Sequence, residues 1–369
     1  MPQSLCRSAE ETPTLARRRA AGEVIVTTRL HLAALALLLG ATVGCNLILG
    51  TEPPLPLGTG GSAASTGTSG GCSIGGAPTM GPPPCGDAEW THWNPTAPHD
   101  YTTKQGCDGT TYVIDALTRL AWQTPAPPDK SAVTWADADA YCKGLTWGGF
   151  QGWRLPTLVE LASLTLYEQA SPSLDTTAFP DAKGGDFWTG TDSDYFSNSV
   201  YIVSQDDGHI DSRKAENMVT ASVQCVRDLK PAADTSCVRY TLVDGDEAVQ
   251  DQETGLIWQR EQSIGTKMWK NEQAQYEAKD ACAALTLAGR TWRLPKVSEL
   301  VTLLAITATN NPSGLDPQFF GNDQPEPGDY YWTATAQVGN TNHAWGVDMT
   351  TFVTVSVLNT NENYVRCVR

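Results

Sequence analysis

A run of aspartates is the first group of residues with the chemistry to bind a metal ion. It comprises Asp192, Asp194, Asp206, Asp207 and Asp211. Carboxylate oxygens are the ligands that Ca²⁺ prefers, but an EF-hand loop presents them in a fixed order. The aspartates here lack that order, and no matching run occurs later in the chain. We therefore expect a solvated acidic loop, no metal site and no resident cofactor, with calcium as the alternative.

Catalytic side chains need partners at defined positions, and the sequence pattern supplies none. A nucleophile needs an adjacent base, yet His209 and His343 do not occupy matching positions. A glycosidase needs two carboxyl groups at a set separation, whereas the recurring acids fit helix caps and turns. The G-x-S-x-G string at 67–71 lies in a low-complexity segment rather than between a strand and a helix. We expect no catalytic residue and no enzyme activity.

Arginines and tryptophans are the remaining candidates for a binding surface. A basic edge for sulfate groups could be formed by Arg227, Arg366 and Arg369. Trp345 has no obvious counterpart elsewhere in the chain, and with Trp90 and Trp93 it is a candidate for an exposed, ligand-facing position. The formal net charge of −16 opposes sulfated polymers at long range. It also makes a binder of the nucleic-acid backbone implausible, because such a protein needs an excess of Lys and Arg.

Most of the chain consists of an internal repeat, and this repeat determines where the candidate residues lie in the fold. The string DALTRLAWQ at 115–123 recurs as DQETGLIWQ at 251–259, WRLP at 153–156 recurs at 292–295, and CVR at 225–227 recurs at 367–369. Two units of this length indicate a duplicated domain rather than a solenoid. We place the first copy at 101–228 and the second copy at 237–369. Two binding sites would result if both copies retain one.

Each copy reads as an α+β domain. Thr134 can cap a helix whose apolar positions include Ala138 and Cys142. A second helix begins at Thr157 with a capping box, and Lys296 replaces this cap in the second copy. Alternating apolar residues around 200–203 and 344–357 then predict short antiparallel strands. The expected order is therefore two early helices followed by strands.

The cysteines indicate an oxidising compartment. Ten are present, and eight remain after Cys6 and Cys45 are assigned to the N-terminal segment. The repeat symmetry favours Cys142–Cys225 in the first copy and Cys282–Cys367 in the second. We favour a third pair, Cys72–Cys85, but Cys107 could also pair with Cys72, Cys85 or Cys237. A zinc site is disfavoured because no C-x-x-C occurs and the five histidines are scattered.

Several motifs in order resemble the Lcl C-terminal domain family, a domain of unknown function found on a collagen-like bacterial adhesin. They are D-x-x-T-G-L-I-W-Q, W-x-x-A, Y-C-x-x-L, W-R-L-P-T-x-x-E-L, Y-W-T and V-R-C-V-R. The first copy departs at Arg119, where the family has Gly, and at Gln224, where it has Arg. The resemblance implies a fold related to C-type lectins and formylglycine-generating enzymes. It also implies adhesion, since the family's adhesin binds sulfated glycosaminoglycans. The chain has no collagen tract.

The N-terminal segment resembles a bacterial lipoprotein signal. Basic residues precede an apolar run from Leu30 to Val43, which is shorter than the roughly 20 residues that span a bilayer. The tetrapeptide at 42–45 resembles a lipobox, so we expect a signal at 1–45 with lipidation at Cys45. Asn46 favours the outer membrane by the same resemblance. Residues 46–100 are rich in Gly, Ser, Thr and Pro, which predicts a flexible tether.

These observations predict an exported protein of the bacterial cell envelope, anchored at the outer membrane or cell surface by its lipid. Its duplicated domains would bind glycans or surface proteins without catalysis, and Trp345, Arg227, Arg366 and Arg369 are the candidate ligand contacts. The first alternative is a structural envelope protein without a glycan ligand. The second is a formylglycine-type enzyme, which the fold resemblance alone suggests.

Overall fold

The computed structural model describes residues 93–193, 195–216, 218–229, 238–304, 315–320 and 326–369. The predicted signal, the lipidated Cys45 and nearly all of the predicted tether lie outside these residues, as do Trp90 and Asp194. Among the described residues, no helix has the length and apolar character needed to cross a bilayer.

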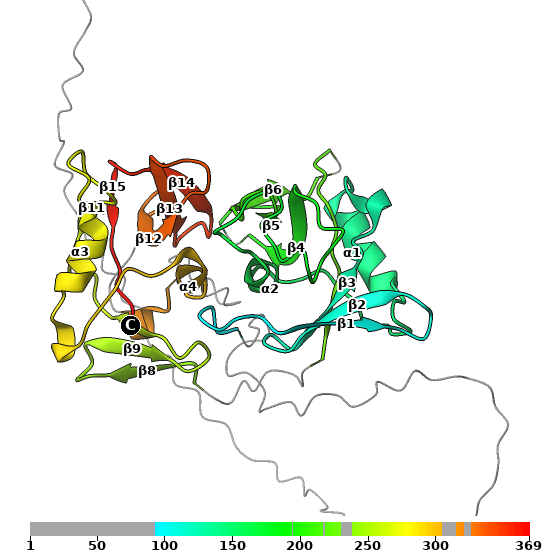
Figure 1. Ribbon diagram of the computed structural model, residues 1–369, viewed down its shortest axis with the longest axis horizontal. Helices are drawn as coiled ribbons and strands as arrows, with labels where there is room; N and C mark the ends of the chain where they lie inside the picture. The colour runs from blue at the N-terminus through cyan, green and yellow to red at the C-terminus, as the bar shows by residue number, and fades with distance from the viewer. Residues whose placement is uncertain (1–92, 194, 217, 230–237, 305–314, 321–325) are drawn as a thin grey trace, which may run out of the picture. The chain divides into compact units, whose positions relative to one another are not determined.

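The first copy contains two small antiparallel sheets and two helices (Figure 1). One sheet has the order β1-β2-β3-β7, formed by Tyr101–Gln105, Thr111–Asp115, Leu120–Thr124 and Val226–Asp228. The other has the order β4-β5-β6, formed by Asp186–Asp192, Ser199–Ser204 and Ile210–Lys214. The helices are α1 (Trp135–Gly144) and α2 (Leu158–Ser163), preceded by the 3₁₀ turn η1 (Pro128–Lys130).

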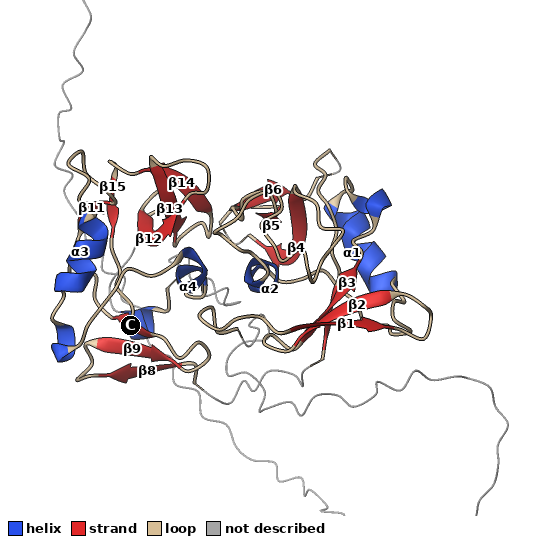
Figure 2. Ribbon diagram, viewed as in Figure 1, coloured by secondary structure: helices blue, strands red, loops and turns tan. Residues whose placement is uncertain are grey.

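The second copy repeats this plan with small differences (Figure 2). Its first sheet has the order β10-β9-β8, formed by Ile257–Gln259, Ala248–Asp251 and Tyr240–Val243. Its second sheet has the order β11-β15-β12-β13-β14, formed by Thr266–Met268, Glu362–Tyr364, Tyr330–Ala336, His343–Asp348 and Thr354–Leu358. The helices are α3 (Glu277–Ala284), α4 (Val297–Val301) and α5 (Pro317–Phe320), with the 3₁₀ turn η2 at Leu287–Gly289.

The predicted helix starts are confirmed. The Thr134 hydroxyl accepts a hydrogen bond from the backbone N–H of Asp137 at the start of α1. At α2, Thr157 accepts from the Glu160 N–H while the Glu160 carboxylate accepts from the Thr157 N–H, which completes the capping box. In the second copy Glu299 still accepts from the Lys296 N–H. The predicted strands are confirmed as β5, β13 and β14.

The expected order of elements is wrong in one respect. Three strands, β1 to β3, precede α1, and four strands, β8 to β11, precede α3; the first three of each copy form an opening sheet. The motif at 115–123 forms the turn and the third strand of this opening sheet. Asp115 holds the turn, because its carboxylate accepts from the Leu117 N–H and the Thr118 hydroxyl. The strands β2 and β3 are short and buried on both faces, so they show no alternation of apolar and polar residues, whereas β1 is largely exposed.

The two predicted disulfides are confirmed. Cys142 of α1 bonds Cys225 next to β7, and Cys282 of α3 bonds Cys367, with a Cα–Cα distance of 5.6 Å in each. All four cysteines are fully buried in the cores of their copies. Cys107 is also disulfide-bonded. The other four described cysteines are bonded to one another, so the choice between the predicted pairings stays open.

The two copies share a hydrophobic core. The Tyr201 hydroxyl donates to the Thr351 carbonyl at 3.1 Å, and the Ile210 N–H donates to the Thr354 hydroxyl at 2.8 Å. Apolar side chains of α2 and α4 belong to the same core cluster. The two copies therefore pack against each other as one unit rather than as two independent domains.

Candidate functional site

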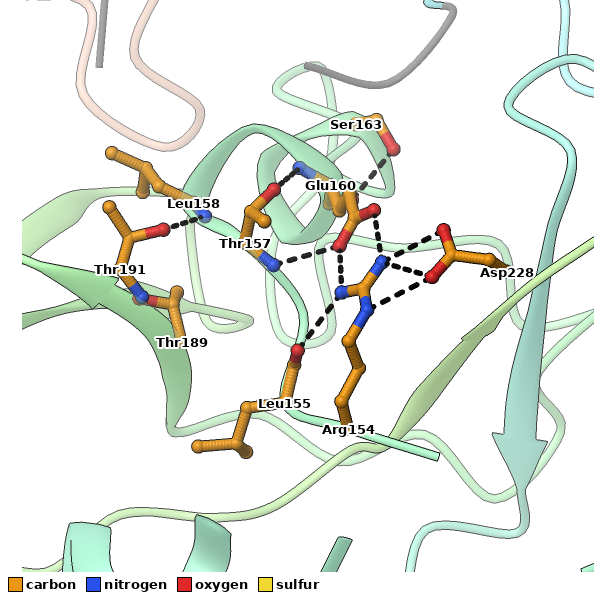
Figure 3. Close-up of polar contacts among 9 residues, drawn as sticks. All are labelled: Arg154, Leu155, Thr157, Leu158, Glu160, Ser163, Thr189, Thr191 and Asp228. Carbon is orange, nitrogen blue, oxygen red and sulfur yellow. Dashed lines mark hydrogen bonds and ion pairs between the residues drawn. The ribbon is translucent and has the colours of Figure 1, made fainter. Parts of the chain in front are cut away.

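Arg154 of the W-R-L-P motif lies at the centre of a polar cluster (Figure 3). Its guanidinium donates two hydrogen bonds to the Glu160 carboxylate, at 2.7 and 2.8 Å. It also donates to Asp228 at 3.0 to 3.1 Å and to the Leu155 carbonyl at 3.1 Å. Burial disfavours its charge, but Glu160 and Asp228 outweigh this effect and raise the pKa of Arg154. The cluster ties β7 to the start of α2.

The same contact recurs in the second copy. Arg293 donates to both oxygens of Glu299, at 2.7 and 2.6 Å. These hydrogen bonds raise the pKa of Arg293 above its ordinary value. Each arginine is therefore held by a buried glutamate of its own copy.

The predicted basic edge is wrong at Arg366. This side chain is only 1% exposed, and its Nη1 donates to the carbonyls of Gln259 and Arg260 at 2.7 and 2.9 Å. Arg227 and Arg369 lie in different copies and are partly buried. Arg227 donates to the Gln151 carbonyl and packs over the Phe150 ring. Arg369 pairs with Asp244 at 2.8 Å. A contact of Arg227 or Arg369 with sulfate stays a prediction.

The expected exposure of two tryptophans is also wrong. Trp345 is 1% exposed and Trp93 is 2% exposed, and both belong to the core that the copies share. Trp345 does have a counterpart, which is Tyr201. The Thr189 hydroxyl donates to the Tyr201 carbonyl just as Thr333 donates to the Trp345 carbonyl. The sequence comparison missed this equivalence because the residue types differ.

Three of the four described aspartates of the acidic run pair with neighbouring side chains. Asp207 bonds His209 at 2.7 Å, Asp211 pairs with Arg213, and Asp206 accepts from the Ser171 hydroxyl. The hydrogen bond to Asp207 raises the pKa of His209 against the effect of burial, and in turn lowers the pKa of Asp207. Among the residues that the structure describes, no group of three or more His, Cys, Asp or Glu is arranged to hold a metal.

A cleft of about 290 Å³ in the first copy is the strongest candidate for a binding site. Its inner wall is buried and largely apolar, formed by Leu174, Phe179, Phe187, Ala221, Val223 and Gln224. The loop around η1 and the glycines at 184 and 185 form its rim, together with two lysines and two aspartates, Lys130, Lys183, Asp181 and Asp186. An apolar floor with a few polar groups is typical of a ligand site.

The second copy fills the equivalent space with its own side chains. Arg366 takes the place of Gln224, because Cys225 and Cys367 occupy the same position next to them. The Arg366 guanidinium lies 5.3 Å from the ring centroid of Phe320 and 5.9 Å from that of Tyr331. Phe320 corresponds to Phe179, since Tyr240 and Tyr101 contact them in the same edge-on way. Gln224, at a position where the family has Arg, was therefore the residue in the sequence that indicated the cleft.

A second hollow of about 300 Å³ lies beside the segment 93–101 and the start of α4. His99 lines it, and its Nδ1 lies 2.8 Å from the buried Asp115 carboxylate. In the second copy Arg239 takes this place and pairs with Asp251 at 2.8 Å. A carboxylate that holds a histidine can orient it as a catalytic base. In the second copy, however, the same place is occupied by an ion pair of arginine and aspartate, which has a purely structural role. Sequence reasoning missed His99 because it precedes the recognisable repeat.

The sequence model of the Lcl C-terminal domain family matches the chain twice, at residues 111–227 and 247–369. The two matches cover the helices and the terminal disulfide of each copy, whereas the first strand of each opening sheet, β1 and β8, precedes them. Among curated proteins, none matches the chain.

Proposed function

The chain belongs to the Lcl C-terminal domain family, in two tandem copies, and from this premise we propose that it is an exported, non-catalytic recognition protein of the bacterial cell envelope. The open cleft of the first copy is the observation that carries the proposal. Its apolar floor offers area for burial and its polar rim offers orientation, which is what a binding site needs. Glycans and surface proteins are the two proposed ligand classes.

The envelope location rests on three features. Two buried disulfides, one in each copy, are typical of proteins that fold in an oxidising compartment. The lipobox-like sequence ending at Cys45 supports a lipid anchor, and Asn46 supports the outer membrane. The segment 46–100 would then hold the paired domains away from the membrane surface. In this proposal the domains are related to C-type lectins in fold and serve adhesion.

The test is a binding screen with the full chain on a glycan array and a peptide array. It is run at low and physiological salt, with calcium and with EDTA, for the wild type and for Gln224→Arg. Selective binding that survives physiological salt and is lost in the variant supports recognition through the cleft. Loss in EDTA would instead assign a calcium-dependent site. If neither array gives selective binding, the recognition proposal fails and a structural role in the envelope replaces it.

A further inference from the structure

We propose that the cleft of the first copy binds an arginine side chain presented by a partner protein. The inference rests on the proposed function and narrows its ligand to a guanidinium cation. It follows from the second copy, where an arginine of the chain itself occupies the corresponding space.

Arg366 shows how this scaffold accommodates a guanidinium. Two backbone carbonyls, those of Gln259 and Arg260, accept hydrogen bonds from Nη1. The rings of Phe320 and Tyr331 lie within cation–π distance. Carbonyl acceptors and ring faces suit a cation that has five N–H donors and no acceptor.

The first copy retains the counterparts of these groups. Gln123 and Thr124 match Gln259 and Arg260, because the Gln123 N–H bonds the Cys225 carbonyl as the Gln259 N–H bonds that of Cys367. Phe179 and Phe187 match the two rings, and both line the cleft with Thr124. Gln224 is shorter than an arginine, and its Nε2 reaches the Gln123 carbonyl at 3.3 Å, the long end of a hydrogen bond.

Two further replacements keep this space open. Ser222 stands where Tyr364 stacks on Tyr331 in the second copy. Thr124 stands where Arg260 reaches the Phe319 carbonyl. Three large side chains of the second copy are thus replaced by smaller ones around a single space in the first.

The charge of the surroundings is compatible with a cationic ligand. Asp181 and Asp186 lie on the rim of the cleft, and Asp186 already pairs with Arg213 at 3.3 Å, which leaves Asp181 as the main rim carboxylate for a ligand. Of the two rim lysines, Lys130 is 3.3 Å from Asp129 and packs over the Tyr141 ring, while Lys183 is exposed to solvent. The net charge of −16 favours the approach of a basic partner at long range.

The experiment measures binding of blocked arginine, Nα-acetyl-arginine-N-methylamide, to the full chain by calorimetry or ligand-observed NMR. The control ligand is blocked citrulline, which has nearly the same shape without the charge. We expect citrulline to bind at least tenfold more weakly. Gln224→Arg should weaken arginine binding at least tenfold, whereas Gln273→Arg, which adds the same charge at an exposed position of the second copy, should leave it within twofold.

Ser222→Tyr fills the cleft by a second route and replaces Gln224→Arg if that variant fails to fold. Equal binding of arginine and citrulline, or arginine binding that neither cleft-filling variant weakens, overturns the proposal. If blocked arginine does not bind but the array signal is still lost in Gln224→Arg, the cleft is the recognition site for another ligand and only the arginine assignment falls. If neither the probe nor the arrays bind, both proposals fall.

Discussion

Replacing Arg154 by Ala should destabilise the first copy by about 3 kcal/mol, the lower end of the cost of breaking a buried ion pair. Glu160 is 2% exposed, so its carboxylate would lose both hydrogen bonds from the Arg154 guanidinium while remaining buried. It would keep the hydrogen bond from the Thr157 N–H, and water could enter beside the partly exposed arginine, which limits the loss. Asp228 lies on the other side of Arg154 and is 41% exposed. Asp228→Asn should therefore cost no more than about 1 kcal/mol.

The assay is urea denaturation of the full chain at 25 °C, followed by tryptophan fluorescence and circular dichroism. The matched control is Arg293→Ala, which should cost somewhat less than Arg154→Ala, because Glu299 is 1% exposed but Arg293 is 47% exposed and water reaches its place more readily. The double variant Arg154→Met, Glu160→Leu should recover most of the loss, since it leaves no buried charge without a partner. The reasoning is refuted if Asp228→Asn costs as much as Arg154→Ala, or if the double variant is less stable than the single one.

Three further outcomes follow from local geometry. Arg119 has a φ of 60°, and the equivalent residue of the second copy, Gly255, has a φ of 74° with no atom within 4 Å of where a Cβ would lie. Arg119→Gly should therefore raise the free energy of unfolding by up to about 1 kcal/mol, and Gly255→Arg should lower it by about 1 kcal/mol. Both changes are measured from denaturation midpoints. Removing the disulfide of the first copy by a double Ser variant should cost up to about 4.5 kcal/mol, because it closes a loop of 83 residues; an unchanged thermal midpoint would contradict this. The raised pKa of His209 stabilises the protein fully below pH ~6.5 and less as pH rises through the folded value; the lowered pKa of Asp207 adds stability that is lost only in acid. His209→Asn should accordingly flatten the stability profile between pH 6 and 8, measured by urea midpoints.

Local signals predicted the parts of the fold that depend on local interactions. Thr134 and Thr157 cap their helices through residues three positions away, so the sequence pattern was sufficient. The disulfides were predictable because the duplication supplied two examples of the same pairing. By contrast, β2 and β3 of the opening sheet were missed because strands buried on both faces lack a period-two pattern.

The candidate site depends on contacts between distant segments. Phe179 and Gln224 line one cleft although 45 positions separate them in the sequence. Trp345 was expected at the surface because tryptophan without a counterpart suggests a ligand contact, yet it packs on Tyr167 of the other copy at a centroid distance of 5.8 Å. No pattern within one copy could reveal that neighbour. The Gln224 departure was visible in the sequence, but its consequence required the positions of the two rings.

The asymmetry between the copies changes what the duplication can do. Two equal sites would give avidity within one chain, but Arg366 fills in the second copy the space that is open in the first. Under the proposed function, these clefts would therefore give one chain one site, and avidity would require several chains side by side. The second copy still contributes, because Thr351 and Thr354 bond Tyr201 and Ile210 and so support the sheet of the first copy. Its cleft is closed while its packing surface is retained, which is the division expected when one copy of a duplicated domain binds and the other stabilises it.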